Sequence, residues 1–337
     1  MISERTFIYF APMEGVTTAA LRVVHHRIFP GTDRYYTPFL TATKSGSFKT
    51  RELRDIDPKR NAGIPLAVQL QALDPVDFAR SAWRMEALGY EEVNLNLGCP
   101  AATAVSRGRG AGMLGDPEIP DRFFDTAFRE LERLGCSARI TVKTRIGLDT
   151  TEHAPALIRV FNRYPIRELI VHPRLRTDYY GGEPKLDVFR DWMRESVHPL
   201  CYNGDITTVK GFEALRESLL SAEKSSLSGF MIGRGLLRNP ALIREIRGGA
   251  PLETTELAAY MAAVLRSHIE TGIGENNAVW RMKELWSYLR PVFPDADKGF
   301  KKLRKARDLP AYEAAAAMIL ETDMGSAEGI SAAPVRI

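Results

Sequence analysis

Polar and charged side chains stand at the carboxyl ends of several short apolar runs of this chain. Gln69 lies in PLAVQL, Cys99 follows EEVNLNL, and Lys143 lies inside RITVKTR. Similar runs end near Met13, His172, Arg174, Asn203, Asp205 and Arg234. If the runs are strands of one parallel barrel, their carboxyl ends share a face, where such barrels place their active sites. One such residue would have a structural explanation, but a polar residue after nearly every run predicts a site.

The types of these residues limit the ligands and reactions that such a site could serve. A lysine inside a strand must reach an opening or a partner, because burying its charge alone is costly. Lys143 could therefore stabilise an anionic ring or form a Schiff base. The amides of Gln69 and Asn96 offer both donors and acceptors, which suits the edge of a flavin ring, and Lys143 suits the negative charge of reduced flavin. No G-x-G-x-x-G segment follows a run, so a nicotinamide site of Rossmann type is unsupported.

Two segments that contain glycine, NGD (203–205) and GRG (233–235), end the last two runs. Parallel barrels often bind phosphate at this place through backbone N–H groups. Glycine also ends strands for steric reasons alone. Occurring together, the two segments predict a ligand that carries a phosphate.

Eight runs rich in β-branched and aromatic residues alternate with amphipathic stretches before Pro240. The predicted strands are 7–13, 34–39, 65–70, 91–97, 139–145, 168–173, 199–204 and 229–235. This pattern predicts an α/β fold, a (β/α)₈ TIM barrel, over residues 1–245. Beyond it only helical patterns remain, at 253–271, 278–289, 297–306 and 312–320. We therefore expect an all-helical domain at 250–321 and a flexible tail at 322–337.

The composition is that of an ordinary globular protein: 45% of the 337 residues are hydrophobic, 26% are charged, and the net charge is +4. No run approaches the roughly 18 apolar residues of a membrane span, so we expect a cytoplasmic protein. The three cysteines, Cys99, Cys136 and Cys201, are far apart, which fits a reducing compartment and predicts no metal site. The mild positive charge is compatible with a polyanionic partner.

Six segments, in this order, resemble those of the tRNA-dihydrouridine synthases: APMEGVT (11–17), LNLGCP (95–100), VKTRIG (142–147), VHPR (171–174), NGD (203–205) and MIGRG (231–235). These are FMN enzymes that reduce uridine in tRNA to 5,6-dihydrouridine. RMKELWSYL (281–289) and FKKLRKA (300–306) look like the family's carboxyl-terminal tRNA-binding domain. The resemblance implies FMN as cofactor, NADPH as reductant and tRNA as substrate, and it implies no obligate protein partner.

Carried over position by position, the resemblance also implies roles for single residues. Against the flavin ring it places Ala11, Pro12, Met13, Gln69, Asn96, Lys143 and His172. At the ribityl phosphate end it places Asn203, Gly204, Asp205, Gly233 and Arg234. Cys99 would be the proton donor.

The chemistry of uracil agrees with this role for Cys99. The 5,6 double bond is conjugated to a carbonyl, so carbon 6 accepts a hydride and carbon 5 then needs a proton. A thiol with the ordinary pKa of about 8.5 is largely protonated at neutral pH and can act as that acid. Gly98 permits an unusual turn and Pro100 restricts the backbone, which suits a thiol held on a loop. Cys136 and Cys201 are expected to be structural.

The chain departs from the family pattern in two loops. A lysine commonly follows the Cys-Pro pair, whereas this chain has AATAV, with Thr103 at its centre and Arg107 as the nearest base. A histidine, small residue, arginine, threonine run appears here as HPRLRT, with Pro173 after the histidine. Both loops are expected to meet the target nucleotide, so the modified position stays open.

A basic segment, DKGFKKLRKAR (297–307), has six Lys or Arg in eleven residues. As a helix it places Lys298, Lys301, Lys302 and Lys305 close to one face, which is a suitable surface for phosphates. Further RNA contacts are predicted at Arg107, Arg174, Arg176, Arg281 and Lys283. A solvated basic helix without a ligand is the alternative, and composition alone does not choose between them.

Three other functions fit parts of the pattern. An FMN barrel could reduce a small enone or a pyrimidine, and the lysines at 298–307 would then be dispensable. A Schiff-base aldolase built on Lys143 would be colourless. An RNA-binding protein or folding helper would bind tRNA without flavin. The sequence leaves open the target position, the use of other RNAs, the choice between NADPH and NADH, and the oligomeric state.

Overall fold

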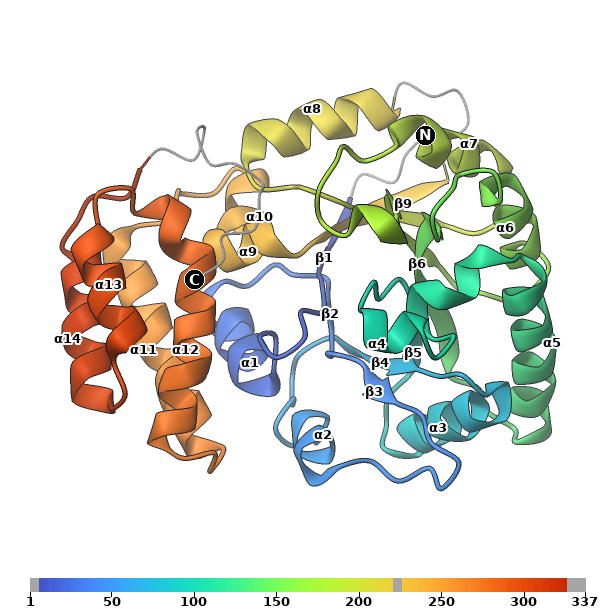
Figure 1. Ribbon diagram of the computed structural model, residues 1–337, viewed down its shortest axis with the longest axis horizontal. Helices are drawn as coiled ribbons and strands as arrows, with labels where there is room; N and C mark the ends of the chain where they lie inside the picture. The colour runs from blue at the N-terminus through green and yellow to red at the C-terminus, as the bar shows by residue number, and fades with distance from the viewer. Residues whose placement is uncertain (1–5, 221–225, 326–337) are drawn as a thin grey trace. The chain divides into compact units, whose positions relative to one another are not determined.

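The structure is a computed structural model that describes residues 6–220 and 226–325 (Figure 1). Its contacts divide the chain into two compact units. The barrel unit comprises Met1–Pro12, Asp33–Gly204 and Arg216–Met231, and the helical unit comprises Met13–Thr32, Asp205–Leu215 and Ile232–Ile337. The limits 1–245 and 250–321 stay a prediction, and the predicted tail lies outside the described residues from position 326 onward.

Eight parallel strands close into a barrel within the barrel unit. They are β1 (Phe7–Phe10), β2 (Arg34–Tyr36), β4 (Leu66–Gln71), β5 (Glu92–Leu97), β6 (Arg139–Gly147), β7 (Leu169–Leu175), β8 (Leu200–Asn203) and β9 (Leu227–Ile232). Neighbours follow the order β2-β1-β9-β8-β7-β6-β5-β4, and the pairing of β2 with β4 closes the ring. The predicted (β/α)₈ TIM barrel is confirmed. A short strand that was not predicted, β3 (Leu40–Thr41), pairs with β4.

α3 (Pro75–Ala87), α5 (Glu118–Arg133), α6 (Ala154–Phe161) and α7 (Leu186–Glu195) lie around the outside of the barrel (Figure 1). The other helices between strands are α2 (Thr50–Asp55), α4 (Ala102–Val105) and α8 (Val209–Leu220), with the 3-10 helices η1 (Gly110–Gly115) and η2 (Arg176–Asp178). α3 shows why a helix begins where it does. The side chain of Asp74 accepts hydrogen bonds from two N–H groups of the first turn, and Pro75 occupies the first helical position. β5 and β7 are buried along their whole length because helices cover their outer face.

An ionic cluster closes the barrel interior at the amino ends of the strands. Arg34 lies 2.8 Å from Glu92 and 3.9 Å from Glu168. Tyr36 donates to Glu92 at 3.4 Å, and Tyr9 donates to Glu168 at 3.2 Å. Burial raises the pKa of both carboxyls. This end of a barrel usually serves stability, so the chemistry is expected at the carboxyl ends.

The helical unit is built from α1 (Ala19–Ile28), α9 (Arg234–Arg238), α10 (Leu242–Ile246), α11 (Thr254–Glu270), α12 (Glu275–Leu289), η3 (Arg290–Val292), α13 (Asp297–Lys305) and α14 (Leu309–Leu320). The indole N–H of Trp286 donates to the hydroxyl of Tyr312 at 2.9 Å, which ties α12 to α14. The four helices predicted after residue 250 are confirmed. Within the described ranges, no helix has both the length and the apolar character of a membrane span.

Candidate active site

Cys99 lies on a short loop directly after β5, and Asn96 shapes that loop. Oδ1 of Asn96 accepts hydrogen bonds from the backbone N–H groups of Gly98 (3.0 Å) and Cys99 (2.9 Å). On the other side, the N–H of Ala111 in η1 donates to the carbonyl of Cys99 at 3.2 Å. Gly110 has φ +55°, and a Cβ at this glycine would lie 3.0 Å from Cβ of Cys99. The thiol is therefore half-buried and its backbone is held from both sides.

A chain of hydrogen-bonded side chains runs from this loop into the barrel. Nδ2 of Asn96 donates to Oε1 of Gln69 (2.7 Å), and Nε2 of Gln69 donates to Oδ1 of Asn94 (2.8 Å). Nδ2 of Asn94 donates to Oγ1 of Thr141 (2.9 Å), whose hydroxyl donates to Glu92 (3.2 Å). This polar chain connects the ionic cluster at the amino ends of the strands to the Cys99 loop. Each amide has a fixed direction as a result, since every donor in the polar chain faces an acceptor.

Lys143 lies beside Asn96 in the paired strands β5 and β6. Among the residues that the structure describes, its ammonium group makes no hydrogen bond and no ion pair. Burial, aided by the positive charge of Arg145, lowers the pKa of Lys143 to about 8. An anion next to this ammonium group would be stabilised by a charge that no residue of the described chain neutralises.

Arg145, two residues further along β6, was not among the predicted site residues. Its guanidinium donates to three backbone carbonyls: Gly98 at 3.0 Å, Leu175 at 2.8 Å and Tyr179 at 2.7 Å. Burial lowers the pKa of Arg145 to about 10. Tyr179 has φ +48°, a conformation that a residue with a side chain rarely adopts. Arg145 thus fastens the Cys99 loop to the segment that follows β7.

His172 and Arg174 form a pair on β7. Nη1 of Arg174 lies 3.1 Å from Nε2 of His172. A guanidinium can only donate, so Nε2 of His172 accepts and the imidazole is neutral in this arrangement. The same guanidinium donates to the carbonyls of Gly181 (3.1 Å) and Gly182 (2.6 Å). Arg174 is 1% exposed, and this burial does not suit the RNA contact predicted for it.

Arg176 and Arg107, two other predicted RNA contacts, differ in their surroundings. Nε of Arg176 donates to the carbonyl of Pro100 at 3.3 Å, and its guanidinium lies 5.2 Å from the ring centre of Tyr179. Arg176 therefore adds a second link between the Cys99 loop and the segment after β7. Arg107 is exposed, as is Thr103 in the loop that departs from the family pattern.

The residues predicted at the phosphate end, and the three from 11–13 predicted against the flavin ring, divide between the two units. In the barrel unit, Nδ2 of Asn203 donates to the carbonyl of Met231 at 2.8 Å, Ala11 is buried and Pro12 is half-buried. A Cβ at Gly204 would lie 2.9 Å from the hydroxyl of Tyr202.

In the helical unit, the guanidinium of Arg234 forms an ion pair with Asp205. Asp205 has φ +39° and, with Tyr179, is one of the two described residues other than glycine that have a positive φ. A Cβ at Gly235 would lie 2.1 Å from the carbonyl oxygen of Ile206, so this glycine is required for steric reasons. Gly233 precedes α9, and Met13 donates its N–H to Thr17 at 2.8 Å.

The predicted basic residues of the helical unit lie on α12 and α13. All four predicted lysines of α13 are exposed: Lys298, Lys301, Lys302 and Lys305. Arg281 instead donates to the carbonyl of Gly15 at 2.6 Å. Lys283 donates to the carbonyls of Arg304 (3.1 Å) and Ala306, at the carboxyl end of α13. These two side chains have structural partners that the sequence did not reveal.

The residues of the barrel unit fit a flavin. A flavin ring presents an amide-like edge and becomes anionic on reduction. Here Lys143, whose ammonium has no partner among the described residues, pairs in the sheet with Asn96, whose amide donates to Gln69. Gln69 keeps one donor and one acceptor site, and Asn96 keeps one donor, because its Oδ1 already accepts from Gly98 and Cys99. No group of three His, Cys, Asp or Glu suited to a metal ion occurs in the described part of the chain.

Comparison with protein-family models matches residues 9–322 to the family described as dihydrouridine synthase (Dus). The chain belongs to this family. It is therefore an oxidoreductase, and the family implies a flavin cofactor and a tRNA substrate.

Named dihydrouridine synthases align with most of the chain. "Probable tRNA-dihydrouridine synthase" of Rickettsia bellii is 31% identical over 242 residues, which cover 71% of this chain and 70% of that protein. "tRNA-dihydrouridine(16) synthase" of Pseudomonas putida is 29% identical over 318 residues, which cover 89% of this chain and 93% of that protein. The second alignment includes most of the carboxyl-terminal helices.

Solved structures confirm the barrel. The old yellow enzyme homologue from Zymomonas mobilis superposes with a TM-score of 0.52 at 11% identity, covering 74% of this chain and 90% of that one. Morphinone reductase in complex with tetrahydroNAD gives a TM-score of 0.50 at 15% identity, and the superposition covers 74% of this chain and 88% of that one. At these identities the likeness shows the fold alone.

Proposed function

We propose that this protein reduces uridine in tRNA to 5,6-dihydrouridine in the cytoplasm, with FMN as cofactor and NADPH as reductant. The proposal rests mainly on Lys143, whose ammonium has no partner in the described part of the chain and which pairs in the sheet with Asn96 of the polar chain. When bound and reduced, FMN would supply the hydride that carbon 6 of uracil accepts. The residues of the chain bind the two rings, exclude water and provide the proton for carbon 5.

Lys143 would hold the negative charge of the flavin ring. Its pKa of about 8 means that the ammonium is mostly protonated at neutral pH and binds an anion without displacing another partner. Gln69 would use its remaining donor and acceptor, and Asn96 its remaining donor, on the amide-like edges of flavin or uracil. The polar chain fixes the direction of both amides before either ring arrives, which lowers the cost of ordering them on binding.

Cys99 would donate the proton to carbon 5. Its backbone is fixed by Asn96 and Ala111, so the thiol approaches the base from one direction. His172 would lie against the flavin as a neutral imidazole, because its Nε2 accepts from Arg174. Arg145 does not act on the substrate in this proposal, since its guanidinium is occupied by three carbonyls.

The exposed lysines of α13 would contact the phosphates of tRNA, which set both affinity and its dependence on salt. We propose position 16 as the target. The relatives that align with most of the helical unit as well as the barrel carry that position in their names, as in Pseudomonas putida and Neisseria meningitidis. Because the target uridine must leave its stack, contacts to the rest of the tRNA must supply that energy.

The test uses purified full-length protein and tRNA from a strain that lacks dihydrouridine synthases. The protein should be yellow, lose its colour with NADPH, and produce dihydrouridine that maps to position 16. Protein that binds no flavin, or that bleaches with NADPH but leaves every uridine intact, would contradict the proposal. Reduction of a small enone but not of tRNA would identify an FMN reductase of another kind.

Cysteine variants test the proton donor. Cys99→Ala should bind and reduce flavin normally but lose most tRNA reduction. Cys136→Ala is the matched control, because Cys136 is also half-buried but lies at the opposite, amino end of the strands, just before β6. Equal activity of the two variants on tRNA would refute the role of Cys99.

A further inference from the structure

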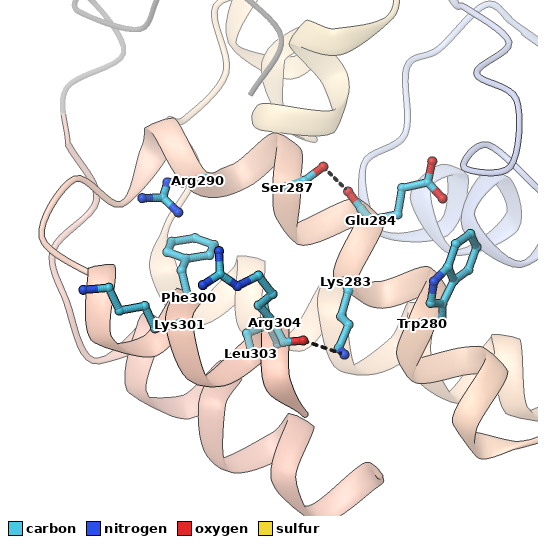
Figure 2. A pocket seen from close by; sticks show the side chains of 9 residues that line it. All are labelled: Trp280, Lys283, Glu284, Ser287, Arg290, Phe300, Lys301, Leu303 and Arg304. Carbon is cyan, nitrogen blue, oxygen red and sulfur yellow. Dashed lines mark hydrogen bonds between the residues drawn. The ribbon is translucent and has the colours of Figure 1, made fainter. Parts of the chain in front are cut away.

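A pocket of about 470 Å³ lies between α12 and α13 in the helical unit (Figure 2). Its volume falls within the range of small-ligand pockets, about 300–1,000 Å³. Trp280 and Glu284 of α12 line one side, Lys301 and Arg304 of α13 line the other, and Phe300 is among the apolar lining residues. The pocket therefore combines a large aromatic ring with several cations.

Trp280 is the unusual residue of this pocket. It is 64% exposed, whereas Trp286 on the same helix is 1% exposed and has a hydrogen-bond partner for its indole N–H. The two faces of α12 explain the difference. Val279, Met282 and Trp286 follow the buried face, and Trp280 lies off it. No ring contact or hydrogen bond of Trp280 occurs in the described residues, so its indole face is available for stacking.

The cations of the pocket fall into two classes. Lys283 donates to the carboxyl end of α13, and Arg290 donates to Asp297 at 2.8 Å. By contrast, the side chains of Lys301 and Arg304 make no hydrogen bond or ion pair within the described ranges. Figure 2 shows the guanidinium of Arg304 next to Phe300, on the side of the pocket opposite Trp280.

The acidic side chain of the pocket does not cancel this charge. Glu284 is the single carboxylate among the described lining residues, against four cations. Burial raises the pKa of Glu284, which favours its neutral form further. The pocket is therefore positive and has one exposed aromatic face.

We propose that this pocket binds one unstacked nucleotide of the RNA substrate, with its base on Trp280 and its phosphate on Lys301 and Arg304. The inference rests on the proposed function and deepens it, because it assigns a second place at which the tRNA is held. A base and its phosphate present a flat ring and a negative charge, and the pocket offers the complement of both. Stacking of a base on an aromatic side chain tolerates any base, so the pocket favours an unpaired nucleotide rather than a particular sequence.

The experiment measures equilibrium binding of tRNA to the full-length protein at several salt concentrations. Trp280→Ala should weaken binding about ten-fold, as expected when one base stack is removed, and should leave the salt dependence unchanged because the indole is uncharged. Trp280→Phe should restore part of the affinity. Trp83→Ala is the matched control, since Trp83 is also an exposed indole but lies on α3 of the barrel unit.

Charge variants test the binding of the phosphate. In the double variant Lys301→Ala, Arg304→Ala, the slope of log K against log salt should become shallower by about 0.7, because the slope counts neutralised phosphates and both cations hold the same phosphate. Lys298→Ala, Lys305→Ala removes the same charge from the same helix but not from the pocket. Only the first double variant should also abolish the effect of Trp280→Ala, because a nucleotide whose phosphate is not held does not reach the indole.

Two results would overturn the inference: unchanged tRNA affinity of Trp280→Ala, or an equal decrease in Trp83→Ala. Either result would show that stacking on Trp280 makes no specific contribution to tRNA binding. The measurement is of binding, so it remains informative if tRNA is not reduced. Conversely, weaker binding by Trp280→Ala with full reduction at saturating tRNA would support both the pocket and the proposed function.

Discussion

The polar chain of the barrel makes one prediction that separates stability from catalysis. Asn94 is fully buried, accepts from Gln69 at 2.8 Å and donates to Thr141 at 2.9 Å. Asn94→Leu keeps a similar volume but removes both bonds. The N–H of Gln69 then lacks an acceptor, which costs about 1–3 kcal/mol. Thr141 is affected less, since its hydroxyl still donates to Glu92.

The effect on activity follows from the position of Gln69. Without Asn94, the amide of Gln69 can rotate. Nδ2 of Asn96 then has no fixed acceptor, although Oδ1 of the same side chain shapes the Cys99 loop. A displacement of about 1 Å in catalytic geometry costs roughly 100-fold in rate. We therefore expect kcat on tRNA to fall by about 10- to 100-fold, with the KM for tRNA unchanged because the RNA contacts are elsewhere.

The assay compares Asn94→Leu with Asn61→Leu. Asn61 is also buried in the barrel unit, and its amide donates to the carbonyls of Asp55 (2.9 Å) and Asp57 (3.0 Å), outside the polar chain. Urea unfolding should show a similar decrease in stability in both variants, whereas the kcat and the flavin absorption spectrum should change only in Asn94→Leu. Equal kcat values in the two variants would refute a positioning role for the polar chain.

Three further predictions concern single residues. The pKa of Lys143 is lowered to about 8, so the ammonium is present below that pH and absent above it. The affinity of the protein for anionic flavin should therefore fall as the pH rises through 8. The same titration of the Lys143→Met variant should show no such fall. Arg145→Lys keeps the charge, but one ammonium group cannot replace the planar guanidinium that donates to three carbonyls. We therefore expect a lower kcat with flavin still bound, and faster proteolysis of the segment after β7. Gly235→Ala places a methyl group 2.1 Å from the carbonyl oxygen of Ile206, and urea unfolding should show a destabilisation of about 1–3 kcal/mol; an unchanged midpoint would refute the steric argument.

The barrel was predictable because its signals are local. In runs such as 91–97 and 139–145, Val, Ile or Leu alternates with polar residues, which is the period of a strand, and helix starts such as Asp74-Pro75 carry their own capping groups. β3 was missed because two residues carry too little pattern to be distinguished from a loop. The association of α1 with the helical unit was also missed, since an amphipathic helix does not indicate which apolar surface it covers.

The position of the candidate site was predictable to the level of strand ends. A charged or amide side chain at the end of an apolar run is visible in one sequence, and this signal indicated Gln69, Asn96, Cys99 and Lys143. The roles of the arginines were not visible. In the sequence, Arg174 cannot be distinguished from an arginine on the surface. In the structure, its guanidinium donates to His172 and to backbone carbonyls.

The eight strands, the helical segment after them and the residue types at the strand ends all follow from the order of the amino acids. Which of these residues are free, and which already have partners, depends on how the chain packs. Among the described residues, the ammonium of Lys143 has no partner while the guanidinium of Arg145 donates to three carbonyls, and Trp280 is exposed while Trp286 is buried. Packing decides this because the partners are backbone carbonyls and ring faces brought together from distant segments, and a carbonyl leaves no signal in the identity of its residue.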